Sequence, residues 1–400
     1  MKAGWDLRTL QQVSTIVNGG TPDTNVPDYW DGDILWITPK DMGKLRGRFV
    51  DDTFRKLTLV GLKNSSAKIL PPNSLILSSR APIGHLAINS KPISTNQGCK
   101  GLIPSDHLDA FYLYYFLLNS VEYLNSLGTG ATFKELSGSK LGQVEIPLPP
   151  LPEQQRIVAI LDEAFAAIDK AKANAEKNLK NAKELFESYL QGVFENKRER
   201  LKEVKISEIG LCQTGSTPKT TDKENFGNFI PFIKPADVNF TGVGDIRYTN
   251  DGLSEIGLKK ARNMKKGSIL MVCIGATIGK VGFTEIEVSC NQQINSLTPK
   301  EEYESKYIYY AMSSKSFQKK IVSEGKGAQA TLPIINKSKW ENLSISIHLD
   351  KNEQRKYSIA LDALSTEAKH LESIYHQKLA NLEELKKSIL QKAFNGELNT

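Results

Sequence analysis

Basic side chains gather beside glycines at two places in this 400-residue chain. Lys44, Arg46 and Arg48 form the first group, next to Phe49. The second group, in the other half of the chain, contains Lys259, Lys260, Arg262, Lys265 and Lys266. Lysine and arginine on flexible loops can contact the phosphates of a nucleic acid, and arginine can also bind a guanine edge. Both groups therefore predict nucleic-acid contact, although each could equally be a run of charges that keeps the surface soluble.

Hydroxyl and amide side chains in glycine-rich loops add to these candidates. Residues 128–132 read Gly-Thr-Gly-Ala-Thr, and residues 325–331 read Gly-Lys-Gly-Ala-Gln-Ala-Thr. Two turns, at 19–22 and 215–218, each place a threonine before a proline. The side chains expected to reach DNA from these loops and turns are Thr21, Thr129, Thr132, Lys134, Thr217, Lys326, Gln329 and Thr331. Arg80 is a further candidate, and the alternative for it is a strand cap before Ala81-Pro82.

Residues that would indicate an enzyme form no recognisable catalytic pattern. The segment 275–281 is one residue short of a phosphate-binding loop and lacks its hydroxyl. The acidic residues at 31–33 and 51–52 are better explained as solvated loop acids than as ligands of a nuclease metal. The five histidines and four cysteines lack metal-ligand spacing. We therefore expect no catalytic residue, no metal site and no cofactor in this chain.

The net charge of +7 is unevenly distributed along the chain. Residues 151–196 carry 6 basic against 8 acidic side chains, and residues 351–400 carry 8 against 7. The basic excess therefore lies outside these two segments, in residues 1–150 and 197–350, where contact with a polyanion is expected. No stretch reads as a signal peptide or a membrane span, and the scattered cysteines suit a reducing compartment, so the expected location is the cytoplasm.

The whole chain is duplicated with a period of about 200 residues. A Gly-[Gly/Ser]-Thr-Pro turn occurs at 19–22 and 215–218, and an Asn-Gln pair at 96–97 and 291–292. A Tyr-x-Tyr-Tyr motif follows in each half, and the order of the motifs is the same. Short β-rich runs bounded by glycine, proline or asparagine surround them. Each half, 1–150 and 197–350, is therefore predicted to form one α+β domain.

A long apolar stripe follows each domain, in segments 151–196 and 351–400. Its apolar residues step by three and four, which is the spacing of a helix-pairing seam. The residues expected to pair the helices or to dock partners are Ile157, Leu161, Ile168, Leu185, Tyr189, Tyr357, Leu361, Leu371, Leu382, Leu385 and Ile389. Pairing predicts two tandem-repeat α+β domains separated by two long helices in an antiparallel coiled coil, with pseudo-two-fold symmetry. The alternative is that each helix folds back on its own domain.

A proline-rich entry to the first long helix joins the duplicated motifs as a signature of one protein family. It is the run Ile-Pro-Leu-Pro-Pro-Leu-Pro-Glu-Gln-Gln-Arg-Ile-Val-Ala-Ile-Leu-Asp at 146–162. These features closely resemble the specificity subunit of Type I restriction-modification systems, and the resemblance covers the full chain. The tail at 390–398 is also typical of the family. The second copy departs from the pattern because residues 345–355 contain no proline, although Glu353, Gln354 and Arg355 remain.

The resemblance implies a non-catalytic subunit with two target-recognition domains, each reading half of a split asymmetric site in double-stranded DNA. The paired helices would measure the spacer and dock two methyltransferase subunits, and two restriction or motor subunits would complete the complex. S-adenosylmethionine, ATP and magnesium would belong to those partners.

A motif that is identical in two readers cannot explain a difference in what they read. Base readout is therefore expected in the unmatched stretches 43–80 and 239–266, which leaves the matched motifs for phosphate contact or for the core. The rival interpretations are a duplicated protein–protein scaffold without base readout and, less directly, a self-contained nuclease.

Overall fold

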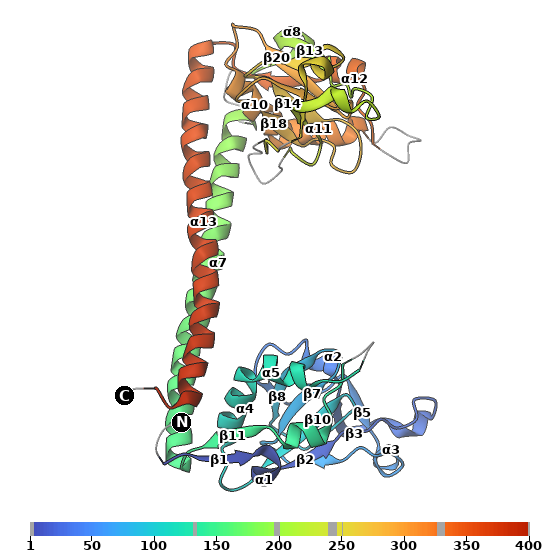
Figure 1. The fold of residues 1–400 in the computed structure, drawn as a ribbon, viewed down its shortest axis with the longest axis vertical. Helices are drawn as coiled ribbons and strands as arrows, with labels where there is room; N and C mark the ends of the chain where they lie inside the picture. The colour runs from blue at the N-terminus through green and yellow to red at the C-terminus, as the bar shows by residue number, and fades with distance from the viewer. Residues whose placement is uncertain are drawn as a thin grey trace. The chain divides into compact units, whose positions relative to one another are not determined.

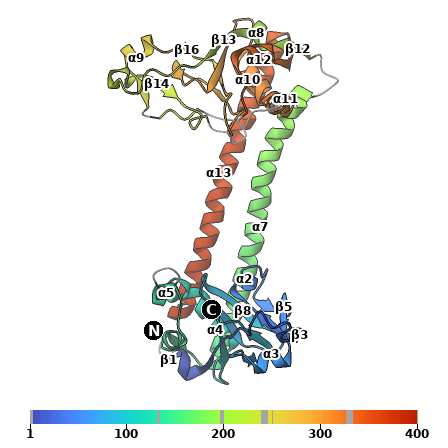
Figure 2. The same ribbon diagram turned by 90° about the vertical axis from the view of Figure 1, so that its right-hand side faces the viewer.

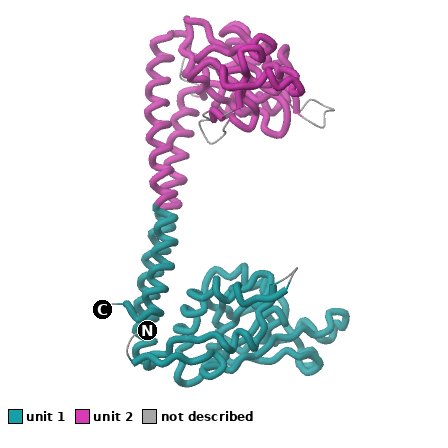
Figure 3. The backbone as a smooth tube through the Cα atoms, viewed as in Figure 1, with its two compact units in different colours: residues 1–174, 378–400 teal, residues 175–377 magenta. Residues whose placement is uncertain are grey.

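A computed structural model describes residues 4–130, 134–195, 201–238, 246–249, 251–325 and 333–398. The chain divides into two compact units (Figure 3), residues 1–174 with 378–400 and residues 175–377. Two long helices, α7 (Leu151–Glu195) and α13 (Lys351–Asn395), each contribute one part to both units. The boundaries between the compact units therefore fall inside the helices, and each unit consists of one domain with two helix segments.

The first domain contains three sheets (Figure 1). Its strands are β1 (Asp6–Thr9), β2 (Ser14–Asn18), β3 (Trp30–Ile37), β4 (Phe49–Val50), β5 (Arg55–Leu57), β6 (Ile69–Leu70), β7 (Leu75–Ser79), β8 (Ile83–Asn89), β9 (Ile93–Thr95), β10 (Cys99–Pro104) and β11 (Glu145–Leu148). The sheet orders are β1-β11, β2-β10-β7-β8-β4 and β5-β3-β9-β6. All five residues of the central strand β7 are buried, which explains its continuous run of apolar and small residues.

Short helices connect and cover these strands. They are α1 (Leu10–Val13), the 3₁₀ helix η1 (Pro27–Tyr29), α2 (Pro39–Met42), α3 (Leu59–Lys63), α4 (Ala110–Asn119), α5 (Val121–Leu127) and α6 (Gly138–Gly142). The sequence predicts a helix around 109–127, and the structure divides it in two. The Asp109 side chain caps the start of α4 by accepting hydrogen bonds from the backbone amides of Phe111 and Tyr112. At the end of α4, the Ser120 hydroxyl donates to the Phe116 carbonyl.

The second domain, in unit 2, repeats most elements of the first, but its described residues contain no counterpart of α2 or of the edge strand β4. Its strands are β12 (Lys202–Lys205), β13 (Gly210–Thr214), β14 (Phe226–Ile233), β15 (Gly252–Leu253), β16 (Asn263–Met264), β17 (Ile269–Val272), β18 (Val281–Phe283), β19 (Val288–Cys290), β20 (Ile294–Pro299) and β21 (Ser344–Ile347). The sheet orders β12-β21, β13-β20-β17-β18 and β15-β14-β19-β16 follow those of the first domain. Its helices are α8 (Ile206–Ile209), η2 (Lys223–Asn225), α9 (Glu255–Lys259), α10 (Ser305–Ser313), α11 (Lys315–Gly325) and α12 (Lys337–Asn342). The predicted duplication of an α+β domain is confirmed.

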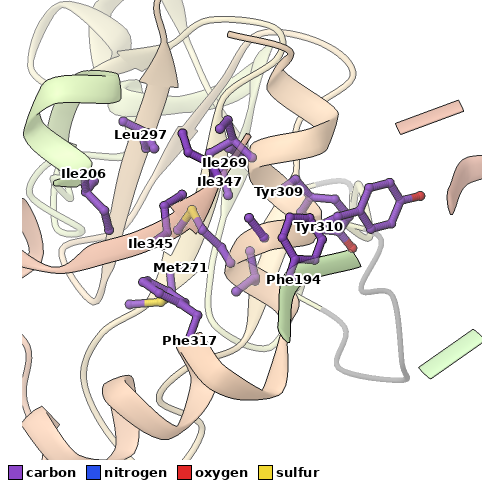
Figure 4. Close-up of a cluster of buried hydrophobic side chains, with 14 of the residues drawn as sticks. Phe194, Ile206, Ile269, Met271, Leu297, Tyr309, Tyr310, Phe317, Ile345 and Ile347 are labelled. Atoms are coloured by element: carbon purple, nitrogen blue, oxygen red, sulfur yellow. The ribbon is translucent and has the colours of Figure 1, made fainter. Parts of the chain in front are cut away.

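The main core of unit 2 joins the sheet to a long helix (Figure 4). Ile269 and Leu297 from the central strands meet Ile345 from β21 in one buried cluster. Phe194, near the end of α7, enters the same cluster and lies with its ring centroid 5.0 Å from that of Tyr307. The helix is therefore part of the domain core, and burying these rings supplies the apolar contact that holds it there.

The two long helices pack together and run antiparallel (Figures 1 and 2). In unit 1, Lys386 Nζ lies 3.6 Å from Asp169 Oδ1, and Lys172 Nζ lies 2.6 Å from Glu383 Oε1. From the first ion pair to the second, the residue number rises from 169 to 172 in α7 and falls from 386 to 383 in α13, so the two helices run in opposite directions. In unit 2 a further pair connects Lys183 to Glu372 at 3.7 Å. The predicted antiparallel pairing is confirmed, and in each unit a segment of both helices also packs against the domain of that unit.

The predicted seam is correct along part of its length. Ile157, Leu161 and Ile168 are buried in one cluster with Leu390 and Phe394 of α13. Leu382 and Ile389 pack against that cluster, and in unit 2 Leu361 is buried, Tyr357 packs beside it and Leu371 is half-buried.

A pairing role is wrong for Leu185, Tyr189 and Leu385, which are 58%, 39% and 47% exposed. The buried stripe instead passes through Phe186 and Leu190. Beyond Ala182 the buried residues Phe186, Leu190 and Phe194 are spaced four apart, and all three belong to the core cluster of the second domain.

The four cysteines are free, buried thiols. Burial raises the pKa of the Cys99 thiol to about 12, so it stays protonated and unreactive at neutral pH. Within the part of the chain that the structure describes, no helix combines the length and the apolar character needed to cross a membrane.

Candidate nucleic-acid interface

The Gly-Gly-Thr-Pro turn of the first domain lies against the Asn-Gln motif, 76 residues further along the chain. The Thr21 hydroxyl donates to the side-chain oxygen of Gln97. The Gly20 amide donates to the Thr95 carbonyl at 2.9 Å. A Cβ placed on Gly19 would overlap the carbonyl oxygen of Asn96, so only glycine permits this approach. Two motifs that sequence analysis matched between the halves thus form one surface.

Arg80 borders the same surface. The amide of Ser79, the residue before Arg80, donates to the carbonyl of Gly98 at 2.8 Å. Gly98 is the residue that follows Gln97 in the sequence. A Cβ on Gly98 would lie 3.1 Å from Nε of Arg80, which places the arginine side chain over this turn. The structure therefore brings Arg80 close to the turn that Thr21 contacts, and the backbone of Arg80 pairs with Glu135 in an isolated β-bridge.

Glu135 lies between two cations and a threonine. Its carboxylate is 3.7 Å from Nη1 of Arg80 and 3.9 Å from Nζ of Lys100. Its backbone exchanges two hydrogen bonds with Thr129, at 3.1 and 2.9 Å. Burial lowers the pKa of Lys100, while the charge of Glu135 opposes that shift. Thr21, Arg80 and Thr129 thus belong to one polar surface, on which Thr129 and Lys134 are exposed.

The second domain builds the same turn contact. The Thr217 hydroxyl donates to the side-chain oxygen of Gln292, and a Cβ on Gly215 would overlap the Asn291 carbonyl oxygen. Arg262 donates to the carbonyl of Thr214 at the end of β13, and so reaches the edge of this surface. The matched surface is therefore present in both domains.

The basic group of the first domain is not brought together. Lys44 and Arg46 are exposed on the loop that follows α2. Arg48 instead binds Asp162 of α7 through two contacts, Nη1 to Oδ1 at 2.5 Å and Nη2 to Oδ2 at 3.1 Å. Its guanidinium carbon lies 4.8 Å from the ring centroid of Phe111. Arg48 therefore fixes the loop to the long helix, which is a structural role.

Basic residues of the second domain are distributed around α9. Lys259 pairs with Glu255 at 3.7 Å, and Lys260 lies 3.4 Å from Glu224. Lys265 and Lys266 are exposed on the turn before β17. Thr132, Lys326, Gln329 and Thr331 lie outside the described residues, and so does part of the stretch 239–266.

A tyrosine and an aspartate join each domain to its long helix. The Tyr115 hydroxyl donates to Asp162 at 2.5 Å, and the Tyr310 hydroxyl donates to Asp362 at 2.6 Å. Burial disfavours the charged Asp162 carboxylate, but hydrogen bonds from Arg48 and Tyr115 outweigh it and lower its pKa. The last tyrosine of the Tyr-x-Tyr-Tyr motif thus has a structural role, because it connects the domain to the long helix.

A buried glutamine fixes the start of each long helix. Gln154 is fully buried; its Oε1 accepts from the Asp109 amide at 2.8 Å, and its Nε2 donates to the carbonyls of His107 and Pro149 at 2.9 and 2.8 Å. Gln354 makes two similar contacts in unit 2: its Oε1 accepts from the Glu304 amide at 2.8 Å, and its Nε2 donates to the His348 carbonyl at 2.7 Å. One side chain therefore connects the domain helix, the last strand and the long helix.

Sequence reasoning missed the roles of Gln154, Gln354, Asp162, Asp362 and Glu135. A usable signal was present, because the glutamines and aspartates are polar residues at matched positions beside the apolar stripe. A polar side chain repeated on a buried helix face needs a hydrogen-bond partner. Glu135 carried no such signal, since its partners come from distant strands.

Comparison with known proteins agrees with this architecture. The chain is 29% identical to the specificity subunit of the type I restriction enzyme MjaIX from Methanocaldococcus jannaschii, over 98% of this chain and 93% of the relative. The HsdS subunit from Thermoanaerobacter tengcongensis has the same fold, with a TM-score of 0.61 at 18% identity, covering 100% of this chain and 98% of that chain. A chain from a solved type I R-M system aligns with a TM-score of 0.76 at 19% identity, covering 100% and 99%.

The family model for the type I restriction modification DNA specificity domain matches residues 2–180 and 198–383, so both halves are matched once. The duplicated motifs, the repeated sheets and the two antiparallel helices agree with that result. This chain belongs to the type I restriction modification DNA specificity family.

Proposed function

We propose that each domain binds one half of a bipartite, asymmetric site in double-stranded DNA, and that the chain catalyses no reaction itself. The observation that carries this proposal is the surface formed by the turn and the Asn-Gln motif, which occurs in both domains with different residues around it. A shared framework with different neighbouring residues is what two readers of different half-sites require. The basic excess outside the long helices supplies attraction to phosphates.

We further propose that the long helices dock two methyltransferase subunits, and that two restriction or motor subunits join the complex. Apolar side chains that the helices leave exposed support a docking role, among them Leu185, Tyr189 and Leu385. S-adenosylmethionine, ATP and magnesium are then held by those partners. The complex would act on cytoplasmic DNA.

Methylation mapping tests the reading of a bipartite site. The chain is expressed with its methyltransferase partner in a host that lacks adenine methylation, and the methylated positions are mapped across the genome. We expect one motif made of two short specified parts and an unspecified spacer of fixed length. Expression of the methyltransferase alone is the control and should give no such motif. Methylation without sequence preference would contradict the proposal.

A salt titration separates a DNA reader from a protein scaffold. Because phosphate contacts release counterions, affinity of the chain–methyltransferase complex for a duplex should fall by about 10³-fold or more between 50 and 200 mM salt. A scaffold without DNA contacts would bind the duplex weakly at every salt concentration.

A further inference from the structure

One pair of cross-strand positions on the shared surface carries different chemistry in the two domains. An isolated β-bridge pairs Arg80 with Glu135 in the first domain, and an isolated β-bridge pairs Ile274 with Ile334 in the second. A charged pair in one domain thus corresponds to an apolar pair in the other. The difference is notable because the surrounding turns are matched.

Strand register shows that the two bridges are equivalent. In the first domain the residue before the bridge, Ser79, donates its amide to the Gly98 carbonyl at 2.8 Å. In the second, Cys273 donates its amide to the Gln293 carbonyl, also at 2.8 Å. Both acceptors stand two residues after the asparagine of the matched Asn-Gln motif. The bridges therefore occupy one position of the repeated fold.

The arginine of the first bridge forms an ion pair with the glutamate across from it. Its side chain is 35% exposed, and its Nη1 lies 3.7 Å from Oε2 of Glu135. The other oxygen of Glu135 lies 3.9 Å from Nζ of Lys100, whose side chain is only 8% exposed. A guanidinium has five N–H donors, so its contact with Glu135 leaves several of them for a ligand on the surface.

The equivalent position in the second domain presents hydrocarbon. Ile334 is 44% exposed and Ile274 is half-buried. The residue that corresponds to Lys100 in the strand register is Asn295, because Lys100 pairs with Leu77 of β7 as Asn295 pairs with Met271 of β17. The buried cation is therefore absent at this place, in keeping with the loss of the carboxylate that it neutralises.

We propose that this cross-strand position determines one base pair in each half-site. Arg80, positioned by Glu135, donates to the O6 and N7 acceptors of a guanine in the first half-site. Ile334, with Ile274, contacts the methyl group of a thymine in the second. The inference rests on the proposed reading of DNA by both domains, and it assigns the asymmetry of the site to residues at one matched place.

The test is methylation mapping of the intact complex with single variants of this chain. Arg80→Ala should relax the preference for guanine at one position of one half-site by on the order of 10- to 100-fold. Glu135→Gln should relax the same position by a smaller factor, because the guanidinium is kept but no longer aimed. Ile334→Ala should lower the preference for thymine at one position of the other half-site.

Arg8→Ala is the matched control, since Arg8 lies on β1 in the separate two-stranded sheet β1-β11. It should leave both half-sites unchanged. Arg80→Lys keeps the charge and lacks the fork of donors, so it reports on guanine preference if the alanine variant is poorly folded.

Two results would overturn the inference while leaving the proposed function in place. The first is an unchanged motif with all three variants. The second is uniform weakening of all sequences by Arg80→Ala, with a salt slope reduced by about 1, because that is the signature of a phosphate contact. Absence of any motif with the unaltered chain would instead contradict the proposed function.

Discussion

Replacing Gln154 by alanine is expected to lower the melting temperature of unit 1 by about 5–10 °C, from a loss of about 2–3 kcal/mol. The substitution removes three hydrogen bonds, leaves the Asp109 amide and the His107 and Pro149 carbonyls without this partner, and opens a cavity in a fully buried place. Differential scanning calorimetry of the full chain measures the shift. Gln354→Ala should have the matching effect on unit 2.

Gln155→Ala provides an unusually close control for that experiment. Gln155 is the next residue of the same helix turn, and it is exposed. Both substitutions change helix propensity equally, so the difference between them isolates the buried contacts. Equal melting temperatures for the two variants would show that the buried glutamine does not hold the helix to the domain.

Replacing Gly19 by alanine should weaken binding of the specific DNA site by roughly 100-fold, which corresponds to about 3 kcal/mol. The added methyl group would overlap the Asn96 carbonyl oxygen and force the turn away from the Asn-Gln motif. That displacement separates Thr21 from Gln97 and disturbs the whole matched surface. Binding of the complex to labelled duplex at fixed salt gives the measurement, and Gly215→Ala should act similarly in the second domain.

Gly192→Ala is the control for the glycine variants. A Cβ at Gly192 meets no atom within 4 Å, and the residue lies on the exposed side of α7. This variant should bind DNA like the unaltered chain. Comparable losses for Gly192→Ala and Gly19→Ala would exclude the matched turn as the cause.

Much of the architecture could be predicted from the sequence because it repeats. The helix expected within 151–196 runs from Leu151 to Glu195, and its copy expected within 351–400 runs from Lys351 to Asn395. The stripe and its duplication both identify a long buried helix face, and a local period is visible without knowledge of the fold.

The sequence alone does not determine which apolar residues of the long helices are buried. Counting steps of three and four selected Leu185 and Tyr189, whereas Phe186 and Leu190 are buried. The choice between adjacent apolar residues depends on the domain that packs on the helix, and periodicity contains no record of that contact. The candidate site shows the same limit, since Arg48 was grouped with its sequence neighbours but binds an aspartate 114 residues away.

The partner of the helix aspartate differs between the domains, and this has a consequence for exchanging recognition segments. In unit 1 the cation is Arg48, from the unmatched loop; in unit 2 it is Lys306 of α10, whose Nζ lies 2.9 Å from Asp362 Oδ2. A segment grafted between β3 and β6 must therefore contain an arginine that can reach Asp162. Without it, Asp162 keeps only the hydrogen bond from the Tyr115 hydroxyl. The second domain imposes no such condition. It is thus the more tolerant acceptor for new recognition sequences, whether they arrive by recombination or by design.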